Sequence, residues 1–254
     1  MDLGLNGRTA LITGGSMGIG RACAEALAAE GCALHLAARG AEALDATRAD
    51  LQNRYGVAVT CHPADLTDGD QARALADACP RIDILVNNAG AIPRGDLWRV
   101  SEPLWRQAWD LKVFGYINLC RAVYPRMREH GRGVIINVIG AGGERPTLDY
   151  IAGGAGNAAL MAFTRALGAR SLKEGIRVLA VNPGLIRTAR LESLLRGLAQ
   201  TRLGDADRWQ ELVPRTPPPG APEDVGRVVA FLSSDCARYI TGTVVTVDGG
   251  ATAA

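Results

Sequence analysis

Short apolar runs alternate with amphipathic stretches along almost the whole chain, and this alternation restricts the possible folds more than any other feature. Seven such runs occur, in the order TALIT, CALHLAA, VAVTCHPA, DILVNNAG, VIINVIG, RVLAVNPG and VVTVDGG. The intervening stretches predict helices near Arg21–Glu30, Ala41–Tyr55, Asp70–Cys79 and Glu102–Glu129, and a glycine-bearing helix within Asp149–Leu167. Strands that alternate with helices form a parallel sheet through right-handed crossovers. We therefore predict one α/β domain over residues 1–254, a doubly wound seven-stranded parallel sheet with helices on both faces.

Residues 187–222 interrupt this alternation. Leu, Arg and Gln dominate the segment, and TPPPGAP closes it as a stiff turn before the next helix. We expect a lid-like insertion over the carboxyl ends of the strands. Its arginines either bind a carboxylate or phosphate of a substrate, or form the solvated face of short amphipathic helices. These arginines are Arg190, Arg196, Arg202, Arg208 and Arg215.

The composition excludes several classes of partner. The 254 residues are 48% hydrophobic, enough for a sizeable core, and the net charge of +2 comes from scattered residues, which argues against a nucleic-acid partner. The six cysteines lie far apart, with no CxxC motif and no histidine at metal-ligand spacing, so we expect reduced thiols and no metal site. No leader or membrane-spanning pattern follows Met1. A cytoplasmic protein with a small-molecule partner is the resulting expectation.

Three glycines follow the first predicted strand, in the stretch TALITGGSMGIGRA. Gly14, Gly18 and Gly20 lie between this strand and the start of a helix. Glycines at such a turn let backbone N–H groups approach a pyrophosphate, and the helix dipole adds attraction. The spacing is G-x-x-x-G-x-G rather than the G-x-G-x-x-G of the dinucleotide fingerprint. The motif therefore predicts a dinucleotide site, with a ligand-free glycine-rich turn as the alternative.

The end of the second predicted strand indicates which dinucleotide binds. An acidic residue at this place would hold an unphosphorylated ribose hydroxyl, but the sequence HLAARG carries Arg39 instead. A guanidinium pairs well with a 2′-phosphate, and Ser16 can add a hydroxyl. We therefore expect NADP(H) rather than NAD, while a solvated surface arginine is the alternative.

Four stretches together resemble the short-chain dehydrogenase/reductase family. They are TGGSMGIG, Asp65 after the third predicted strand, NNAG at Asn87–Gly90 and NPGLIRT at Asn182–Thr188, and they occur in the family's order over nearly the whole chain. The resemblance implies a Rossmann-type fold and an NADP(H)-dependent enzyme that exchanges hydride with a carbonyl or alcohol substrate. The cofactor-binding residues implied are Gly14, Ser16, Gly18, Ile19, Gly20, Arg39, Asp65, Asn88, Ala89, Gly90, Pro183, Gly184, Ile186 and Thr188.

The resemblance also assigns roles to these residues. It implies that Asp65 contacts the adenine, that Asn88, Ala89 and Gly90 lie at the ribose side, and that the segment from Pro183 to Thr188 lies at the nicotinamide. From the residues alone, Asp65 could instead begin a turn leading to Thr67, and NNAG could be a structural turn.

The family's catalytic residues are replaced in this alignment. The family uses a Tyr, a Lys four residues later, a Ser and an Asn. NAALMAFTRALG resembles the family's KAALxxFTRAL, which places Asn157 at the Lys position and Gly153 at the Tyr position. The strand VIINVIG then places Gly140 at the Ser position, and WDLKVFG places Lys112 at the Asn position. All four positions therefore differ from the family pattern.

A rearranged catalytic group is one explanation. Tyr150 precedes the usual Tyr position by about one helical turn, so Tyr150 and Lys112 could together form a proton donor with a cationic partner, with Asn157 as a third candidate catalytic residue. Alternatively, Tyr150 packs at a helix start, and Lys112 reaches solvent or is neutralised. The carboxylates considered for Lys112 are Asp110, Glu144 and Asp149.

The glycines of the last helix have a second explanation. Gly153, Gly154 and Gly156 each cost about 0.8–1 kcal/mol relative to Ala in a helix interior. Loss of the Ser and Tyr side chains at Gly140 and Gly153 would empty volume beside the nicotinamide, for a bulkier ligand or another chain. The resemblance implies a dimer or tetramer packed through the helix near 102–129 and the glycine-bearing helix.

Two functions remain open at the level of sequence. One is an oxidoreductase with nonstandard proton transfer by Tyr150, Lys112 or ordered water. The other is a cofactor-binding protein that has lost redox chemistry, as a sensor or assembly partner, or a fold reused for a reaction such as lyase chemistry. The fold does not decide between them.

Overall fold

The computed structural model describes residues 2–253 and contains the predicted parallel sheet. The strands lie in the order β3-β2-β1-β4-β5-β6-β7, and every neighbouring pair is parallel. Strand order reverses between β1 and β4, as in a doubly wound fold. The prediction of fold class is therefore confirmed. The strands are β1 (Thr9–Thr13), β2 (Ala33–Ala38), β3 (Val59–Pro63), β4 (Ile84–Asn87), β5 (Gly133–Val138), β6 (Ile176–Pro183) and β7 (Val244–Val247).

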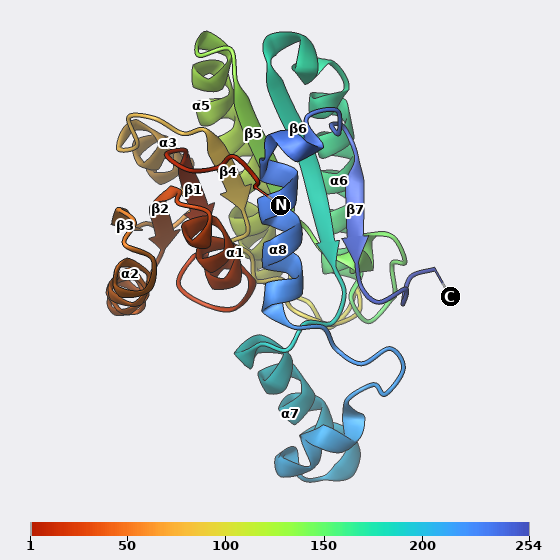
Figure 1. Cartoon of the computed structure of the whole chain (residues 1–254). Helices are drawn as coiled ribbons and strands as arrows, with labels where there is room; N and C mark the ends of the chain where they lie inside the picture. The colour runs from red at the N-terminus through yellow and green to blue at the C-terminus, as the bar shows by residue number, and fades with distance from the viewer. Residues whose placement is uncertain (1, 254) are drawn as a thin grey trace.

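Helices cover both faces of the sheet. On one face, α1, α2 and α8 pack through Leu27, Leu44 and Val229, and on the other α3 and α5 pack through Leu75 and Leu119, next to α6. Figure 1 shows α1 and α8 in front of the strands and α5 and α6 behind them. No helix of the described chain combines the length and apolarity that a bilayer span needs. The helices are α1 (Gly18–Ala29), α2 (Ala41–Tyr55), α3 (Gly69–Asp77), α4 (Glu102–Trp109), α5 (Gly115–Glu129), α6 (Ile151–Ser171), α7 (Ala189–Leu203) and α8 (Pro222–Ser233).

The long helix predicted near 102–129 is continuous but changes its winding in the middle. A turn of π-helix, Asp110–Phe114, joins α4 to α5. Such turns insert an extra residue into an α-helix and occur often at functional sites. In this turn, Lys112 and Val113 are buried. The π-turn therefore directs a lysine inward, which the helical periodicity did not predict.

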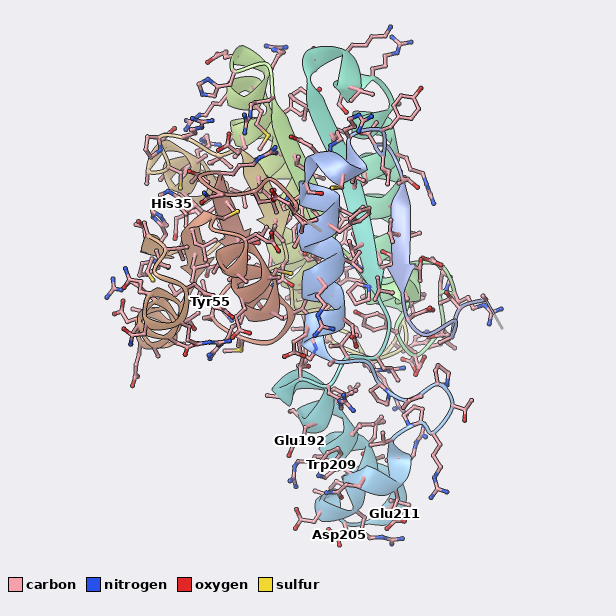
Figure 2. The ribbon with its side chains drawn as sticks, viewed as in Figure 1. His35, Tyr55, Glu192, Asp205, Trp209 and Glu211 are labelled. Atoms are coloured by element: carbon pink, nitrogen blue, oxygen red, sulfur yellow. The ribbon has the colours of Figure 1, made fainter. Side chains whose placement is uncertain are left out.

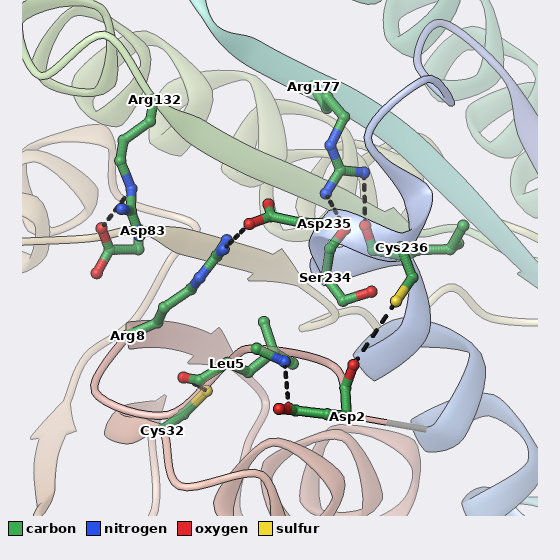
Figure 3. A network of polar contacts seen from close by, with 12 residues as sticks. Asp2, Leu5, Arg8, Cys32, Asp83, Arg132, Arg177, Ser234, Asp235 and Cys236 are labelled. Atoms are coloured by element: carbon green, nitrogen blue, oxygen red, sulfur yellow. Dashed lines mark hydrogen bonds and ion pairs between the residues drawn. The ribbon is translucent and has the colours of Figure 1, made fainter.

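Ion pairs and charged hydrogen bonds connect the amino-terminal edge of the sheet to the end of α8 (Figure 3). The buried Arg177 of β6 donates to the carbonyls of Leu232 and Ser234 at 2.6 and 2.9 Å, which satisfies the end of that helix. Arg8, just before β1, pairs with Asp235 at 2.6 Å. Burial lowers the pKa of Arg177 to about 10, so the guanidinium stays charged at neutral pH. The charged side chains of this edge are therefore used in structural contacts.

The 187–222 insertion extends beyond the carboxyl ends of the strands. It consists of α7 and a 3-10 segment, Ala206–Leu212, and its two ends meet where the Arg187 N–H donates to the Gly220 carbonyl at 2.9 Å. Figure 1 shows α7 projecting away from the sheet. The insertion is therefore a protruding arm in this structure rather than a cover over the strand ends.

Two of the five arginines of the insertion form ion pairs within the insertion itself. Arg196 pairs with Glu192 and Asp207 at 2.9 and 2.6 Å and lies 5.8 Å from the Trp209 ring, which Figure 2 labels. Arg208 pairs with Glu211 at 2.7 Å. Arg202 and Arg215 are exposed. Of the five arginines that could have met a substrate, only Arg190 reaches the strand ends in the described chain.

The glycines of α6 allow close contacts rather than empty space. A Cβ atom at Gly153 would lie 2.0 Å from Cζ of Tyr150, because the tyrosine ring lies directly over this glycine. At Gly156 a Cβ would lie 3.2 Å from Nε1 of Trp109, which donates to the Ala152 carbonyl at 3.0 Å. The expectation of emptied volume at Gly153 is therefore wrong, since the ring of Tyr150 fills it.

The contact between Gly153 and Tyr150 predicts that Gly153→Ala changes the free energy of unfolding in opposite directions with and without the tyrosine ring. Gly153→Ala should lower the free energy of unfolding by about 1–3 kcal/mol, because the new methyl group displaces the Tyr150 ring. In the Tyr150→Ala background the same substitution should raise it by about 0.8–1 kcal/mol, the difference in helix propensity. Urea unfolding of the four proteins measures this cycle. The same sign in both backgrounds would contradict the proposed contact.

Candidate functional site

The turn between β1 and α1 has the shape of a phosphate cradle. Gly14 and Gly18 have φ angles of 64° and 55°, which favour glycine. A Cβ at Gly20 would lie 2.1 Å from the Gly14 carbonyl oxygen, so only glycine fits there. Met17, the N-cap of α1, makes no side-chain cap hydrogen bond, and the first turn of α1, which includes Ile19, carries no acidic residue. The backbone N–H groups at the start of α1 can therefore donate hydrogen bonds to an anion such as a pyrophosphate.

Asn88 joins this cradle to β4. Its amide nitrogen donates to the Thr13 carbonyl at 3.0 Å, and the backbone N–H groups of Asn88 and Ala89 donate to the Thr13 hydroxyl at 2.9 and 3.0 Å. The Asn88 side chain is thus used to hold the ends of β1 and β4 together. In this structure the Asn88 amide contacts the protein backbone. It lies next to the place where the family resemblance implies that the cofactor ribose binds.

The predicted adenine and phosphate residues lie at the ends of β2 and β3. Arg39 follows β2 directly and is exposed, which leaves its guanidinium accessible to a ligand phosphate. Ser16 lies in the cradle, where its carbonyl accepts a hydrogen bond from the Thr47 hydroxyl. After β3, the Asp65 carboxylate accepts from the N–H and hydroxyl of Thr67 at 3.0 and 2.9 Å. The local turn considered for Asp65 is therefore present.

The segment after β6 approaches the cradle from the other side. A Cβ at Gly18 would lie 3.4 Å from the Thr188 methyl group, so the two predicted cofactor segments face each other. Thr188 caps α7 by accepting from the Leu191 N–H at 3.3 Å, and Ile186 is buried. Pro183 ends β6, and Gly184 packs against Asp248. The cofactor residues predicted from sequence therefore line one edge of the sheet.

Lys112 is buried beside this edge. Its ammonium donates to the Ile139 carbonyl at 2.5 Å, and its stem lies along Gly90, where a Cβ would approach Cδ to 2.9 Å. Burial, and to a smaller extent the positive charge of Arg190, lowers the pKa of Lys112 from 10.5 to about 7. At neutral pH this amine therefore exchanges a proton readily, unlike an exposed lysine.

The carboxylates considered as partners of Lys112 are largely engaged elsewhere. Asp149 pairs with Arg94 at 2.5 Å, and Glu144 accepts from the Asn182 amide at 2.6 Å. Among residues 2–253 no ion pair joins a carboxylate to Lys112. Neither alternative for Lys112, neutralisation by one of these carboxylates or a reach to solvent, is therefore seen in the described chain, and its amine is held by a neutral carbonyl.

Arg190 connects the insertion to the site. Its guanidinium donates to the carbonyls of Gly90 and Ile92 at 2.7 and 3.0 Å. Its charge lowers the pKa of Lys112 and opposes the rise in the pKa of Tyr150, which places all three side chains in one electrostatic environment. The sequence grouped Arg190 with four other arginines of the insertion. The sequence feature that could have distinguished Arg190 from these arginines is its position at the very start of α7, next to Thr188.

Tyr150 is the N-cap of α6, and its ring lies over Gly153 and Gly142. The Arg94 guanidinium lies 5.7 Å from the ring centroid. Burial raises the pKa of the phenol above its usual 10, so the group is neutral at physiological pH. No hydrogen bond between Tyr150 and Lys112 occurs within the described chain. The two members of the predicted pair thus share a neighbourhood without direct contact.

Asn157 leaves an acceptor open in the same region. Its amide nitrogen donates to the Gly140 carbonyl at 3.2 Å, while its buried side-chain oxygen finds no hydrogen-bond partner in the described structure. An unpaired buried polar atom is costly, so the oxygen of Asn157 is a candidate acceptor for a hydrogen bond that the protein itself does not supply.

Comparison with known proteins agrees with this geometry. Residues 14–252 match the family described as enoyl-(acyl carrier protein) reductase. A short-chain type dehydrogenase/reductase of Bradyrhizobium diazoefficiens is 36% identical over 256 residues, which cover 96% of this chain and 87% of that protein. The 2-keto-3-deoxy-L-fuconate dehydrogenase of Xanthomonas campestris is 32% identical over 250 residues, which cover 97% of this chain and 80% of that protein.

Solved structures share the fold along the chain. L-sorbose reductase from Gluconobacter frateurii, solved in complex with NADPH and L-sorbose, superposes with a TM-score of 0.93 at 31% identity and covers 100% of both chains. The match therefore extends from the cradle through the insertion to β7 and includes the strand ends at which the candidate residues lie. The predicted family is confirmed: this chain belongs to the short-chain dehydrogenase/reductase family of oxidoreductases.

Proposed function

We propose that this protein binds NADP(H) and exchanges hydride with a carbonyl or alcohol substrate, with Lys112 as the proton-transfer group. The observation that carries the proposal is a buried ammonium with a pKa of about 7 beside the predicted nicotinamide end of the site. A general acid is most effective when its pKa lies near the working pH. Lys112 meets that condition without the Tyr and Lys of the family pattern.

The cradle fits the cofactor. Glycine at Gly14, Gly18 and Gly20 leaves the backbone open to a pyrophosphate, and Arg39 supplies a cation for a 2′-phosphate. The similar L-sorbose reductase is solved with NADPH, which supports the same preference here. When bound, the nicotinamide supplies or accepts the hydride, while the protein provides orientation and charge.

Lys112 and its neighbours can transfer a proton to a substrate oxygen and hold that oxygen in place. Because the Ile139 carbonyl accepts one N–H of Lys112, the other N–H groups of the ammonium remain free to donate to a substrate oxygen. The neutral phenol of Tyr150 can donate a second hydrogen bond that orients this oxygen. Burial, with a smaller contribution from the charge of Arg190, keeps the pKa of Lys112 low, and the Arg190 charge favours negative charge nearby. The acceptor of Asn157 binds a hydroxyl of the substrate or cofactor.

Substitution of Lys112 tests this assignment. Lys112→Met should lower kcat for carbonyl reduction by about 10²–10⁴-fold, the usual contribution of a general acid. In the wild type, the rate of reduction should fall as pH rises through about 7, because Lys112 loses its proton there. Lys173→Met is the matched control, since Lys173 is the other lysine and is exposed. An unchanged rate and pH profile in Lys112→Met removes this residue from the mechanism.

The pH dependence of stability tests Lys112→Met independently of activity. The folded-state pKa of Lys112 is about 7 and the reference value is 10.5, so between these pH values the unfolded chain binds a proton that the folded protein does not. The wild-type free energy of unfolding should therefore gain a contribution from Lys112 as pH rises from about 7 towards 10.5. Lys112→Met lacks this contribution. The free energy of unfolding of the variant, relative to that of the wild type, should therefore be highest below pH 7 and should fall as pH rises above 7. Denaturant titrations on both sides of pH 7 measure the difference.

The cofactor preference has a separate test at Arg39. Arg39→Asp should weaken NADPH binding by roughly 10- to 100-fold, because a charged hydrogen bond to the phosphate contributes about 1.5–3 kcal/mol. NADH binding should improve relative to NADPH, since a carboxylate accepts from the free ribose hydroxyl. Fluorescence titration measures both constants. Arg238→Asp, with the same change of charge on an exposed residue at the opposite edge, should leave both unchanged.

A cofactor-binding protein without redox activity is the second candidate. It is favoured by the raised pKa of Tyr150 and by glycine at both Gly140 and Gly153, where the family carries Ser and Tyr. Saturable NADPH binding without cofactor oxidation, over a panel of sugar, steroid, acyl and aromatic carbonyls, would favour this function. Turnover that depends on Lys112 would exclude it.

We also propose that the protein assembles as a homodimer or tetramer through the α4–α5 face. Phe114 is 50% exposed there, next to a hollow of about 510 Å³ lined by Leu97, Trp105 and Trp109. Such a concentration of exposed apolar side chains is typical of an interface. Light scattering should give a mass that is a multiple of 26.7 kDa, and Phe114→Asp should shift it towards the monomer. Tyr239→Asp, at an exposed aromatic residue on another surface, should leave the mass unchanged. A monomeric wild type would refute the proposal.

A further inference from the structure

Two histidines and a cysteine that are distant in sequence meet on one face of the sheet. His35 lies on β2 and His62 on β3, and the register pairs Ala37 with His62, so both imidazoles point to the same face. Cys79 follows α3, which packs against that face, and it is buried. No metal site was expected from sequence, because none of these residues lies at metal-ligand spacing.

The three side chains are close enough to share one ion. Nδ1 of His35 lies 2.9 Å from Nε2 of His62, and that same Nε2 lies 3.8 Å from Sγ of Cys79. One ligand atom from each residue lies within 4.8 Å of the other two. A tetrahedral zinc site with Zn–N near 2.0–2.1 Å and Zn–S near 2.3 Å has N···N edges of about 3.3 Å and N···S edges of about 3.6 Å. The His35–His62 and His62–Cys79 separations differ from these by a few tenths of an ångström, while the ligand atoms of His35 and Cys79 lie within 4.8 Å of each other.

We propose that His35, His62 and Cys79 bind a thiophilic divalent metal ion such as Zn²⁺. Two imidazole nitrogens and one thiolate are a donor set that this class of metal prefers, whereas Mg²⁺ and Ca²⁺ prefer oxygen. Water completes the tetrahedron. The ion takes the place of the proton in the hydrogen bond between the two histidines, and that proton moves to the other nitrogen of the same ring, so both imidazoles bind the ion in their neutral form.

The surroundings favour neutral imidazoles and keep the thiol protonated in the absence of a metal ion. Burial lowers the pKa of both His35 and His62, which leaves their lone pairs available near neutral pH. Burial raises the pKa of Cys79 to about 11, although the nearby charge of Arg126 opposes the rise. Metal binding therefore releases the Cys79 proton, and affinity increases with pH.

The site would act on the structure around β3. His62 lies one residue before the end of β3, and Cys79 lies after α3, so an ion would connect the two ends of the segment that contains Asp65. In Figure 2, His35 lies on the β2–β3 side of the molecule, far from the insertion that carries Glu192 and Trp209. The metal site is thus separate from the insertion, and its proposal does not depend on the proposed hydride transfer.

A metal-free arrangement is the competing explanation. The His35 and His62 rings stack with centroids 5.1 Å apart and planes inclined by 29°, so the pair could be a hydrogen-bonded contact beside a core thiol. The two explanations differ in one observable. Only a metal site forms a bond between the ion and the Cys79 sulfur.

Titration of the full chain with Zn²⁺ and Co²⁺, after chelator treatment and under reducing conditions, distinguishes them. We expect saturable binding of about one equivalent, a thiolate-to-cobalt charge-transfer absorption, a raised Tm with Zn²⁺ and no effect of Mg²⁺. Cys79→Ser should abolish the charge-transfer absorption. His35→Asn, at a half-exposed position, should weaken binding by about tenfold or more.

Two matched controls use the remaining candidate ligands of the same type. His130→Asn replaces the third histidine and Cys236→Ser replaces the exposed cysteine, and neither should change binding. Absence of saturable binding to the wild type overturns the proposal. So does cobalt binding whose spectrum persists in Cys79→Ser, because the ion is then held elsewhere.

Discussion

The hydrogen bonds between the ends of β1 and β4 are the contact on which the site depends. Thr13 is fully buried, and its hydroxyl accepts two backbone N–H groups from the chain that leaves β4. Asn88 donates back to the Thr13 carbonyl. Strand order reverses at this junction, so the connections leave the sheet in opposite directions and form a crevice at its carboxyl edge. The glycine cradle, the Gly90 backbone and Lys112 are all arranged around it.

Charge is distributed differently at the two edges of the sheet. At the amino edge, Arg8 has a carboxylate partner and Arg177 satisfies helix carbonyls, so these cations stabilise the fold. At the carboxyl edge, the buried Lys112 and the exposed Arg190 donate to neutral backbone carbonyls. A buried cation without a counterion is costly, and protein structures retain such groups most often where function uses them. The burial of Lys112 at the ligand-accessible edge is therefore consistent with the chemical role proposed for it.

The residues proposed for the site are connected to one another by packing and hydrogen bonds. Glycine at Gly153 makes room for the ring of Tyr150, and Asn157 donates to the carbonyl of Gly140. The π-turn that contains Lys112 directs its amine to the carbonyl of Ile139. Each of these residues thus contacts another element of the proposed site.

The sequence by itself determined the sheet, the number of strands and the position of the cradle, because these follow from local periodicity and from glycines at a strand-to-helix turn. Only the tertiary structure decided that Arg190 reaches Gly90, that Tyr150 lies over Gly153, and that His35 and His62 meet Cys79. These contacts join residues from different elements, and strand register and helix packing set them. The burial that lowers the pKa of Lys112 likewise arises from the packed surroundings, which no local pattern contains.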